Sequence, residues 1–173
     1  MKAIWIERLL IRELTTLERE LELVTDEALL WATPPGITNS IGTLTLHLSG
    51  NLQHFIGAIL GKTGYRRQRD LEFSARGVPK AALLAQVAEA KRVVSSVLTA
   101  DTAIDFESEF ADVVGGQYRV GTGDWLINLV AHLAFHVGQV GYLRRILTGD
   151  PASAAGIGIG ALATATRVPD PPR

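Results

Sequence analysis

Apolar residues recur at steps of three and four residues in four stretches of the chain, the spacing that places them on one face of an α-helix. The stretches span residues 3–24, 40–61, 83–97 and 126–147. Ser40 is suited to cap the second helix, and Thr122 is suited to cap the fourth. Pro79 fits the first turn of the third helix, and Gly149 followed by Pro151 would end the fourth. The pattern therefore predicts four amphipathic helices.

The segments between these helices carry no helical pattern. Residues 61–78 are polar and long enough to run the length of a helix bundle, so neighbouring helices need not be antiparallel. Residues 101–121 are irregular, with room for one short pair of strands. We expect an all-α four-helix bundle with long connections between helices two and three and between helices three and four. This single domain would occupy residues 1–150, followed by a Gly-, Ala- and Pro-rich tail over residues 151–173.

The overall composition excludes several classes of function. The chain has 173 residues, with 17 Lys and Arg against 18 Asp and Glu, a formal net charge of -1. Without a basic excess, neither nucleic acid nor a membrane is an expected partner. The absence of cysteine excludes disulfides, zinc fingers and an enzyme thiol nucleophile, and it is compatible with the cytoplasmic location that we expect. The N-terminus carries charges unlike a signal peptide, and we find no run of the roughly 20 apolar residues of a membrane span.

Three of the four histidines are placed where they can meet. His132 and His136 lie four residues apart on one helix, so both imidazoles point to the same side with about 6 Å of axial rise between them. His47 has a similar position in its own helix, at the edge of the core-facing stripe. Three imidazoles from two helices can bind one metal ion and leave room for water or substrate. His54 lies about 10 Å along the helix from His47, too far for both to bind that ion, and Asn51 is a candidate to face the ligand.

The spacing alone leaves a second interpretation of the histidines open. A histidine beside a hydrophobic core is usually packed and hydrogen-bonded, and pairs at i, i+4 also occur without metal. Other metal motifs are absent. The helix over residues 40–61 contains no Asp or Glu, which excludes a di-iron carboxylate bundle. Residues 133–135 are Leu, Ala and Phe, which excludes a His-Glu-x-x-His zinc motif. Any metal site would therefore depend on histidines.

Two segments around these histidines form a recognisable combination. They are Ser40-Ile-Gly-Thr-Leu-Thr-Leu-His47-Leu with Asn51 and His54-Phe55, and His132-Leu-Ala-Phe-His136-Val-Gly-Gln139 with Tyr142-Leu-Arg144-Arg145. In this order, the sequence resembles the DinB-like (DinB/YfiT) superfamily of metalloenzymes. The similarity runs over roughly residues 1–148 and is densest in the second and fourth predicted helices.

The resemblance implies both a topology and a metal centre. It implies an up-down-down-up four-helix bundle and a divalent metal ion, zinc or nickel, held by His47, His132 and His136. It also implies a homodimer. Some relatives are transferases or isomerases that use a low-molecular-weight thiol, and many have no assigned reaction. Because one fold hosts several chemistries, the resemblance does not by itself give the reaction.

Two hypotheses for the function follow. In the first, the protein is a metal-dependent enzyme of transferase or hydrolase type, and the ion lowers the pKa of a bound water or of a thiol cosubstrate. Its catalytic residues cannot be assigned, but four residues are candidates to orient a ligand or to face a small-molecule substrate: Asn51, His54, Gln139 and Tyr142. In the second, the protein is a non-catalytic dimeric binding or stress-response module with structural histidines. Arg144 and Arg145 fall in the last turns of the fourth helix, where we expect them to interact with the helix dipole.

Overall fold

The computed structural model describes residues 2–154 and 158–168, and all regular secondary structure in these residues is helical. The five α-helices are α1 (Ala3–Glu22), α2 (Ile41–Leu52), α3 (Arg69–Ser74), α4 (Lys80–Val97) and α5 (Thr122–Thr148). Two 3₁₀-helices, η1 (Glu27–Trp31) and η3 (Ile159–Ala161), and the π-helix η2 (Gln53–Leu60) complete the elements. No β-strand occurs in the described residues, so the predicted all-α class is confirmed there.

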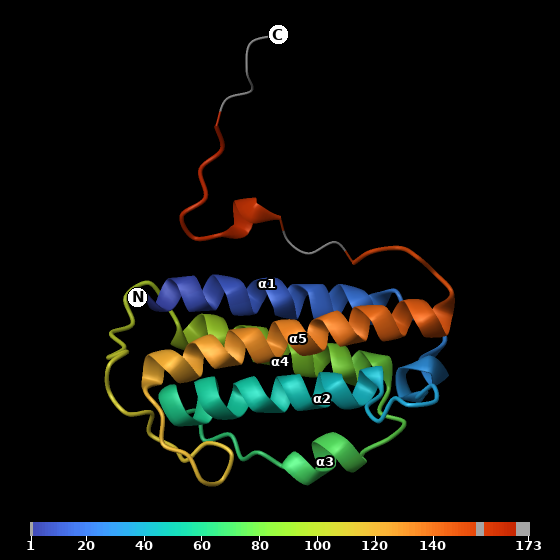
Figure 1. The fold of residues 1–173 in the computed structure, drawn as a ribbon, viewed down its shortest axis with the longest axis horizontal. Coiled ribbons are helices and arrows are strands. Elements are labelled where there is room, and N and C mark those ends of the chain that lie inside the picture. The colour runs from blue at the N-terminus through green and yellow to red at the C-terminus, as the bar shows by residue number, and fades with distance from the viewer. Residues whose placement is uncertain (1, 155–157, 169–173) are drawn as a thin grey trace.

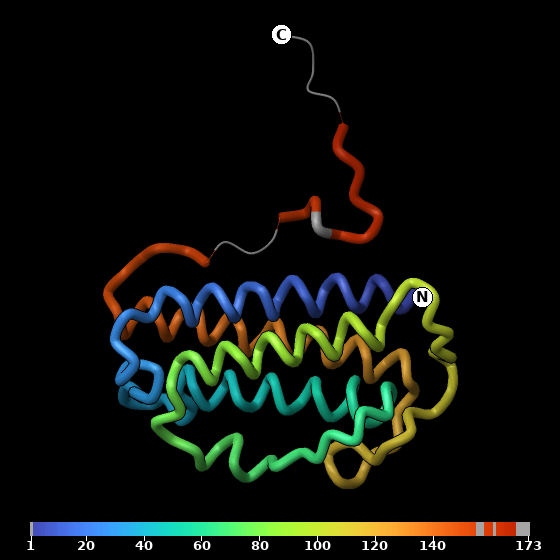
Figure 2. The backbone as a smooth tube through the Cα atoms, turned by 180° about the vertical axis from the view of Figure 1, so that it is seen from behind, coloured from blue at the N-terminus to red at the C-terminus, as the bar shows by residue number. Residues whose placement is uncertain are grey.

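The four long helical segments lie side by side. α1 packs against α4 and α5, and α2 packs against the same two helices. α5 lies between α1 and α2 on one side of the molecule (Figure 1), and α4 lies between them on the other side (Figure 2). α1 and α5 run in one direction, whereas α2 and α4 run in the opposite direction (Figure 1). The short α3 lies along α2 on the side away from α1 (Figure 1).

The apolar stripes of the sequence meet in one hydrophobic core. Burial removes apolar side chains from water, and each fully buried leucine contributes roughly 1.5–3 kcal/mol to stability. The core includes Leu10, Leu14, Leu17 and Leu21 of α1, Leu48 and Leu52 of α2, Leu83 and Val87 of α4, and Leu126, Leu133 and Val140 of α5. Every long helix therefore buries the face that its sequence pattern predicts.

Of the four predicted helix ends, two are confirmed and two are wrong by one residue. Pro79 is the N-cap of α4 and does not lie in its first turn. The side chain of Ser40 accepts a hydrogen bond of 3.1 Å from the backbone N–H of Thr43 and so caps α2. Gly149 ends α5 in the left-handed region, at a φ of 69°, where a side chain would be strained. Thr122, however, is the first residue of α5 and not its cap, because the chain enters the helix through Gly121. The Thr122 N–H donates instead to the carbonyl oxygen of Ser108 at 2.8 Å.

The predicted second helix changes its winding at residue 53, where α2 gives way to the π-helix η2. The wider turn is visible in the 2.9 Å hydrogen bond from the N–H of Gly61 to the carbonyl oxygen of Ile56, five residues earlier. η2 also packs against α4. A Cβ atom at Gly57 would lie 2.9 Å from Val93, so this close approach depends on glycine. The periodicity of the sequence did not predict this change.

The two long connections differ from the sequence-based expectation in opposite directions. The polar segment 61–78 contains α3, which places Glu72 and Phe73 beside α2. The segment 101–121 contains two isolated antiparallel bridges, Glu109 with Gly121 and Val114 with Tyr118, in place of a strand pair.

Arg144 corrects the expectation of a helix-dipole role. Its side chain is completely buried and pairs with Glu20 of α1. Its remaining donors contact the carbonyl oxygens of Asp150 and Ala152 just after α5. Arg144 therefore ties α5 to α1 and to the start of the C-terminal segment. Arg145, in contrast, lies in the last turn of α5 as expected, with its guanidinium 5.0 Å from the ring centre of Tyr142.

By length and composition alone, α5 is apolar enough to cross a membrane, contrary to the expectation that no segment qualifies. Its most apolar window has a mean hydropathy of 1.3, and 39% of that window is buried inside the protein. A core helix of a bundle passes the same test, and α5 packs against α1 and α2.

The C-terminal segment is described only in part. Ala154 is buried, and η3 forms within residues 158–168. The rest of the predicted tail, residues 155–157 and 169–173, lies outside the described residues. The proposed domain boundary at residue 150 stays a prediction.

Candidate metal centre

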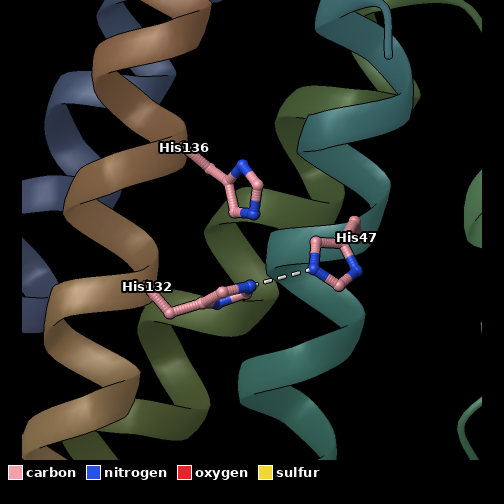
Figure 3. Close-up of side chains that lie close together, drawn as sticks. All are labelled: His47, His132 and His136. Atoms are coloured by element: carbon pink, nitrogen blue, oxygen red, sulfur yellow. Dashed lines mark hydrogen bonds between the residues drawn. The ribbon is translucent and has the colours of Figure 1, made fainter. Parts of the chain in front are cut away.

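Three histidines from two helices come together at one level of the molecule. His47 projects from α2, and His132 and His136 project from α5 toward it (Figure 3). One ring nitrogen of each lies within 4.8 Å of those of the other two. The Nε2 atoms of His47 and His132 are 3.2 Å apart. Two nitrogens bound to one tetrahedral zinc ion at bonds of ~2.0–2.1 Å would be about 3.3 Å apart, so this spacing fits a shared ion.

The ring of His47 is oriented by a carboxylate. Its Nδ1 lies 3.0 Å from Oε2 of Glu72, which accepts the Nδ1–H. Arg67 approaches the same nitrogen at 3.4 Å, but its Nη2 already donates to Glu72 at 2.8 Å. The shorter contact therefore favours the tautomer with hydrogen on Nδ1. This leaves the Nε2 lone pair of His47 facing the other two histidines.

The ring of His136 is oriented in the same way by a neighbour on its own helix. Oε1 of Gln139, three residues later, lies 2.7 Å from Nδ1 of His136 and accepts its N–H. An i, i+3 pair lies on one face of a helix, so the backbone of α5 sets this contact. The Nε2 lone pair of His136 is left free for a metal ion. Metal-binding histidines usually donate their second N–H to such an acceptor.

His132 is neutral at neutral pH. Burial and the neighbouring rings of His136 and His47, together with the charge of Arg67, lower the pKa of His132 to about 4. A metal ion needs the unprotonated nitrogen, so no proton has to be removed from His132 before it binds.

Glu72 was not predicted, although it completes the site. Burial raises the pKa of its carboxyl, but hydrogen bonds from Arg67 and His47 outweigh burial and hold that pKa below its ordinary value. Glu72 therefore stays ionised. Its carboxylate sits directly against Gly50, where the lack of a side chain leaves it room. Phe73, the next residue, packs its ring 4.9 Å from the ring of His47.

The four residues predicted to orient a ligand or face a substrate differ in burial and in hydrogen-bond partners. Asn51 is only 7% exposed, and its Oδ1 accepts no hydrogen bond in the described part of the chain. His54 lies in η2 and pairs with Asp112 at 3.1 Å, so it has its own partner. Tyr142 is 71% exposed, one turn beyond Gln139. Of the four candidates, only Gln139 forms a hydrogen bond with one of the three histidines in these residues.

The arrangement suits a reactive ion better than a structural one. A structural zinc site is closed by four protein ligands, whereas three imidazoles leave a coordination position open. His132 and His136 are half-buried, so the open side reaches solvent. Among the described residues, the group that could hold an ion contains no carboxylate, because the Glu72 carboxylate contacts the far nitrogen of His47 and pairs with Arg67.

Comparison with known proteins assigns the chain to a protein family. Residues 6–160 match the family described as a protein of unknown function, DUF1572. The chain belongs to the DUF1572 family. No curated protein and no solved structure matches it. The matched residues include the three histidines, Glu72 and Gln139, so the whole candidate centre lies within the matched range. The family description states no activity, and the chemistry of the site must carry the functional argument.

Proposed function

We propose that the protein is a DinB-like, metal-dependent enzyme whose single divalent ion, zinc or nickel, is held by His47, His132 and His136. The observation that carries the proposal is the orientation of the rings. The Nδ1 atoms of His47 and His136 each meet an acceptor oxygen, which leaves their Nε2 atoms for a shared ion. In support of the superfamily's up-down-down-up four-helix bundle, α2 and α4 run against α1 and α5 (Figure 1).

The proposed chemistry divides between the ion and the chain. A bound ion supplies a Lewis acid that lowers the pKa of a coordinated water or thiol. The chain keeps His132 neutral and orients the rings of His47 and His136 through Glu72 and Gln139. Because the chain contains no cysteine, a thiol nucleophile would come from a small cosubstrate.

Metal content is the first test. Untagged protein should carry about one divalent ion per chain. His132→Ala and His136→Ala should each lose most of that metal by elemental analysis. His54→Ala is the matched control, since His54 pairs with Asp112, and it should keep its metal. Full metal retention in both the His132 and His136 variants would contradict the proposed ligand set.

Turnover separates the enzyme from the non-catalytic module. The metal-loaded protein is screened for consumption of several small thiols in the presence of several electrophiles. Turnover that disappears in His47→Ala supports the enzyme. No turnover with any pair would favour the alternative, a dimeric binding or stress-response module in which the same histidines stabilise the fold.

We also propose that the protein is a homodimer, as the superfamily resemblance implies. Exposed apolar side chains on the outer face of α5 support it, because a helix facing only water is usually polar there. Ile127 and Phe135 are 54% and 62% exposed. Light scattering of wild-type protein and of Phe135→Glu tests this surface. A dimer that becomes a monomer in the variant supports it, and a monomeric wild type contradicts it.

A further inference from the structure

An apolar cleft of about 480 Å³ lies beside the candidate metal centre. It is enclosed by the loop over residues 34–39 on one side and by the C-terminal half of α5 on the other. The apolar side chains that line it are Pro34, Pro35, Ile37, Leu44, Leu143 and Ile146. No charged side chain lines it, and its volume falls in the range of small-molecule sites.

Both helices that carry the histidines also lead into the cleft. On α2, Leu44 lies one turn before His47. On α5, Gln139 lies one turn after His136. Gln139 contacts both the candidate metal centre and the cleft. Its Oε1 accepts a hydrogen bond from His136, and its side chain lines the cleft. Its amide NH₂ stays available as a donor at this boundary.

We propose that this cleft binds the apolar body of a substrate, such as an alkyl or aryl group, whose polar head reaches the metal ion. The inference rests on the proposed metal centre and adds the substrate class to it. A small polar thiol would leave this apolar surface in contact with water, so the cleft fits the other reactant, the electrophile or ester. Every buried methylene would strengthen binding, whereas a purely polar molecule would gain little.

The test uses a series of metal-binding probes that differ only in apolar length. Acetohydroxamate, butanohydroxamate, hexanohydroxamate and octanohydroxamate are titrated into zinc-loaded protein, and binding is measured by calorimetry. Affinity should rise about three- to fourfold per added methylene until the cleft is filled. In metal-free His132→Ala, the same probes should lose most of their affinity, because the head then has no ion to bind.

Two isoleucines on the same helix give a matched pair of variants. Ile146 lines the cleft and is 66% exposed, so Ile146→Gln should fold normally. It should weaken octanohydroxamate about tenfold and leave acetohydroxamate unchanged. Ile127 is 54% exposed and lies outside the cleft lining, so Ile127→Gln should bind the whole series like wild type. Light scattering of Ile127→Gln separates any effect on the proposed dimer from binding in the cleft. Ile37→Gln repeats the test on the opposite wall.

The outcomes separate the cleft from the metal centre. Equal affinity for all four probes in the wild-type protein would overturn the cleft as a substrate site and leave the metal centre intact. An equal loss in Ile146→Gln and Ile127→Gln would overturn it as well. If acetohydroxamate fails to bind zinc-treated protein, the metal centre itself is wrong and the cleft proposal falls with it.

Discussion

Two arginine–glutamate pairs in this chain are largely shielded from solvent, and they differ in where their remaining hydrogen bonds go. Arg144 pairs with Glu20 across α5 and α1, and its other donors go to the main-chain oxygens of Asp150 and Ala152. All of these partners are parts of the scaffold. This pair connects helices to each other and to the C-terminal segment, and it presents nothing to a ligand.

The second pair, Arg67 with Glu72, is hydrogen-bonded to a histidine ring. Arg67 donates to both oxygens of Glu72, at 2.7 and 2.8 Å, and Glu72 in turn accepts from His47. The other nitrogen of that ring faces two further imidazoles. The comparison shows that a buried ion pair is not by itself evidence of function. What distinguishes the two pairs is the partner of their remaining hydrogen bonds: main-chain oxygens for one pair and a histidine of the candidate metal centre for the other.

The largest expected effect is on the scaffold pair. Arg144→Met leaves Glu20 buried without its partner, which should cost about 3–5 kcal/mol of unfolding free energy. Metal content should remain near that of wild type wherever the variant is folded. Chemical denaturation measures the loss. The double variant Glu20→Gln with Arg144→Met removes both charges and should recover part of it. A wild-type denaturation midpoint in the single variant would show that the pair does not stabilise the fold.

The next largest effect is on metal affinity at the other pair. Glu72→Gln keeps the size of the side chain but weakens the acceptor for the Nδ1–H of His47. Loss of such a partner typically lowers metal affinity about 10- to 100-fold. Competition with a zinc chelator measures the change. Stability of the metal-free protein should fall by less than in Arg144→Met. Unchanged zinc affinity in Glu72→Gln would remove Glu72 from the site.

A glycine substitution should reproduce a smaller part of this effect. An alanine at position 50 would place its Cβ about 3.0 Å from Cδ of Glu72 and displace the carboxylate. We expect Gly50→Ala to lower zinc affinity by up to about tenfold, since the carboxylate can shift in part. Gly138→Ala on α5 is the control, because its Cβ meets no atom within 4 Å. It should stabilise the helix by about 0.5–1 kcal/mol and leave zinc affinity unchanged.

The smallest effect is a pH dependence of the metal-free protein. His132 has a folded-state pKa of about 4, below the ordinary value of 6.5. As the pH falls from 6.5 to 4, the unfolded chain therefore binds the proton first, and stability decreases through this window. Thermal unfolding should show the decrease in wild type and a shallower one in His132→Gln. Parallel curves for the two proteins would contradict a buried, neutral His132.

The positions of the four long helical segments along the chain could be predicted from local patterns in the sequence. The i, i+3 and i, i+4 apolar positions predicted the four long segments, since each helix buries one stripe. The π-helix was not predicted, because its apolar residues carry no local signal for wider turns, and its packing against α4 is a long-range contact. The burial of Arg144 was missed for a similar reason. Its partner Glu20 lies 124 residues earlier in the chain, and no local signal connects them.

The histidine cluster was predicted from spacing and resemblance, but its supporting residues were only half predicted. Gln139 lies three residues from His136, so helix geometry alone brings them together. Glu72 reaches His47 from a six-residue helix in a segment without periodicity. The one available signal was a carboxylate in a connection long enough to pass the histidines. His54 was a candidate by sequence proximity, yet in the π-helix it pairs with Asp112.

The central claim is that three imidazoles share one ion, and X-ray absorption of zinc-loaded, untagged protein tests it most directly. The account predicts a first shell of nitrogen and oxygen ligands at about 2.0–2.1 Å, with outer-shell scattering from three imidazoles. It also predicts that this outer-shell signal falls to two imidazoles in any His132→Ala protein that retains zinc. A zinc environment without imidazole scattering would contradict it.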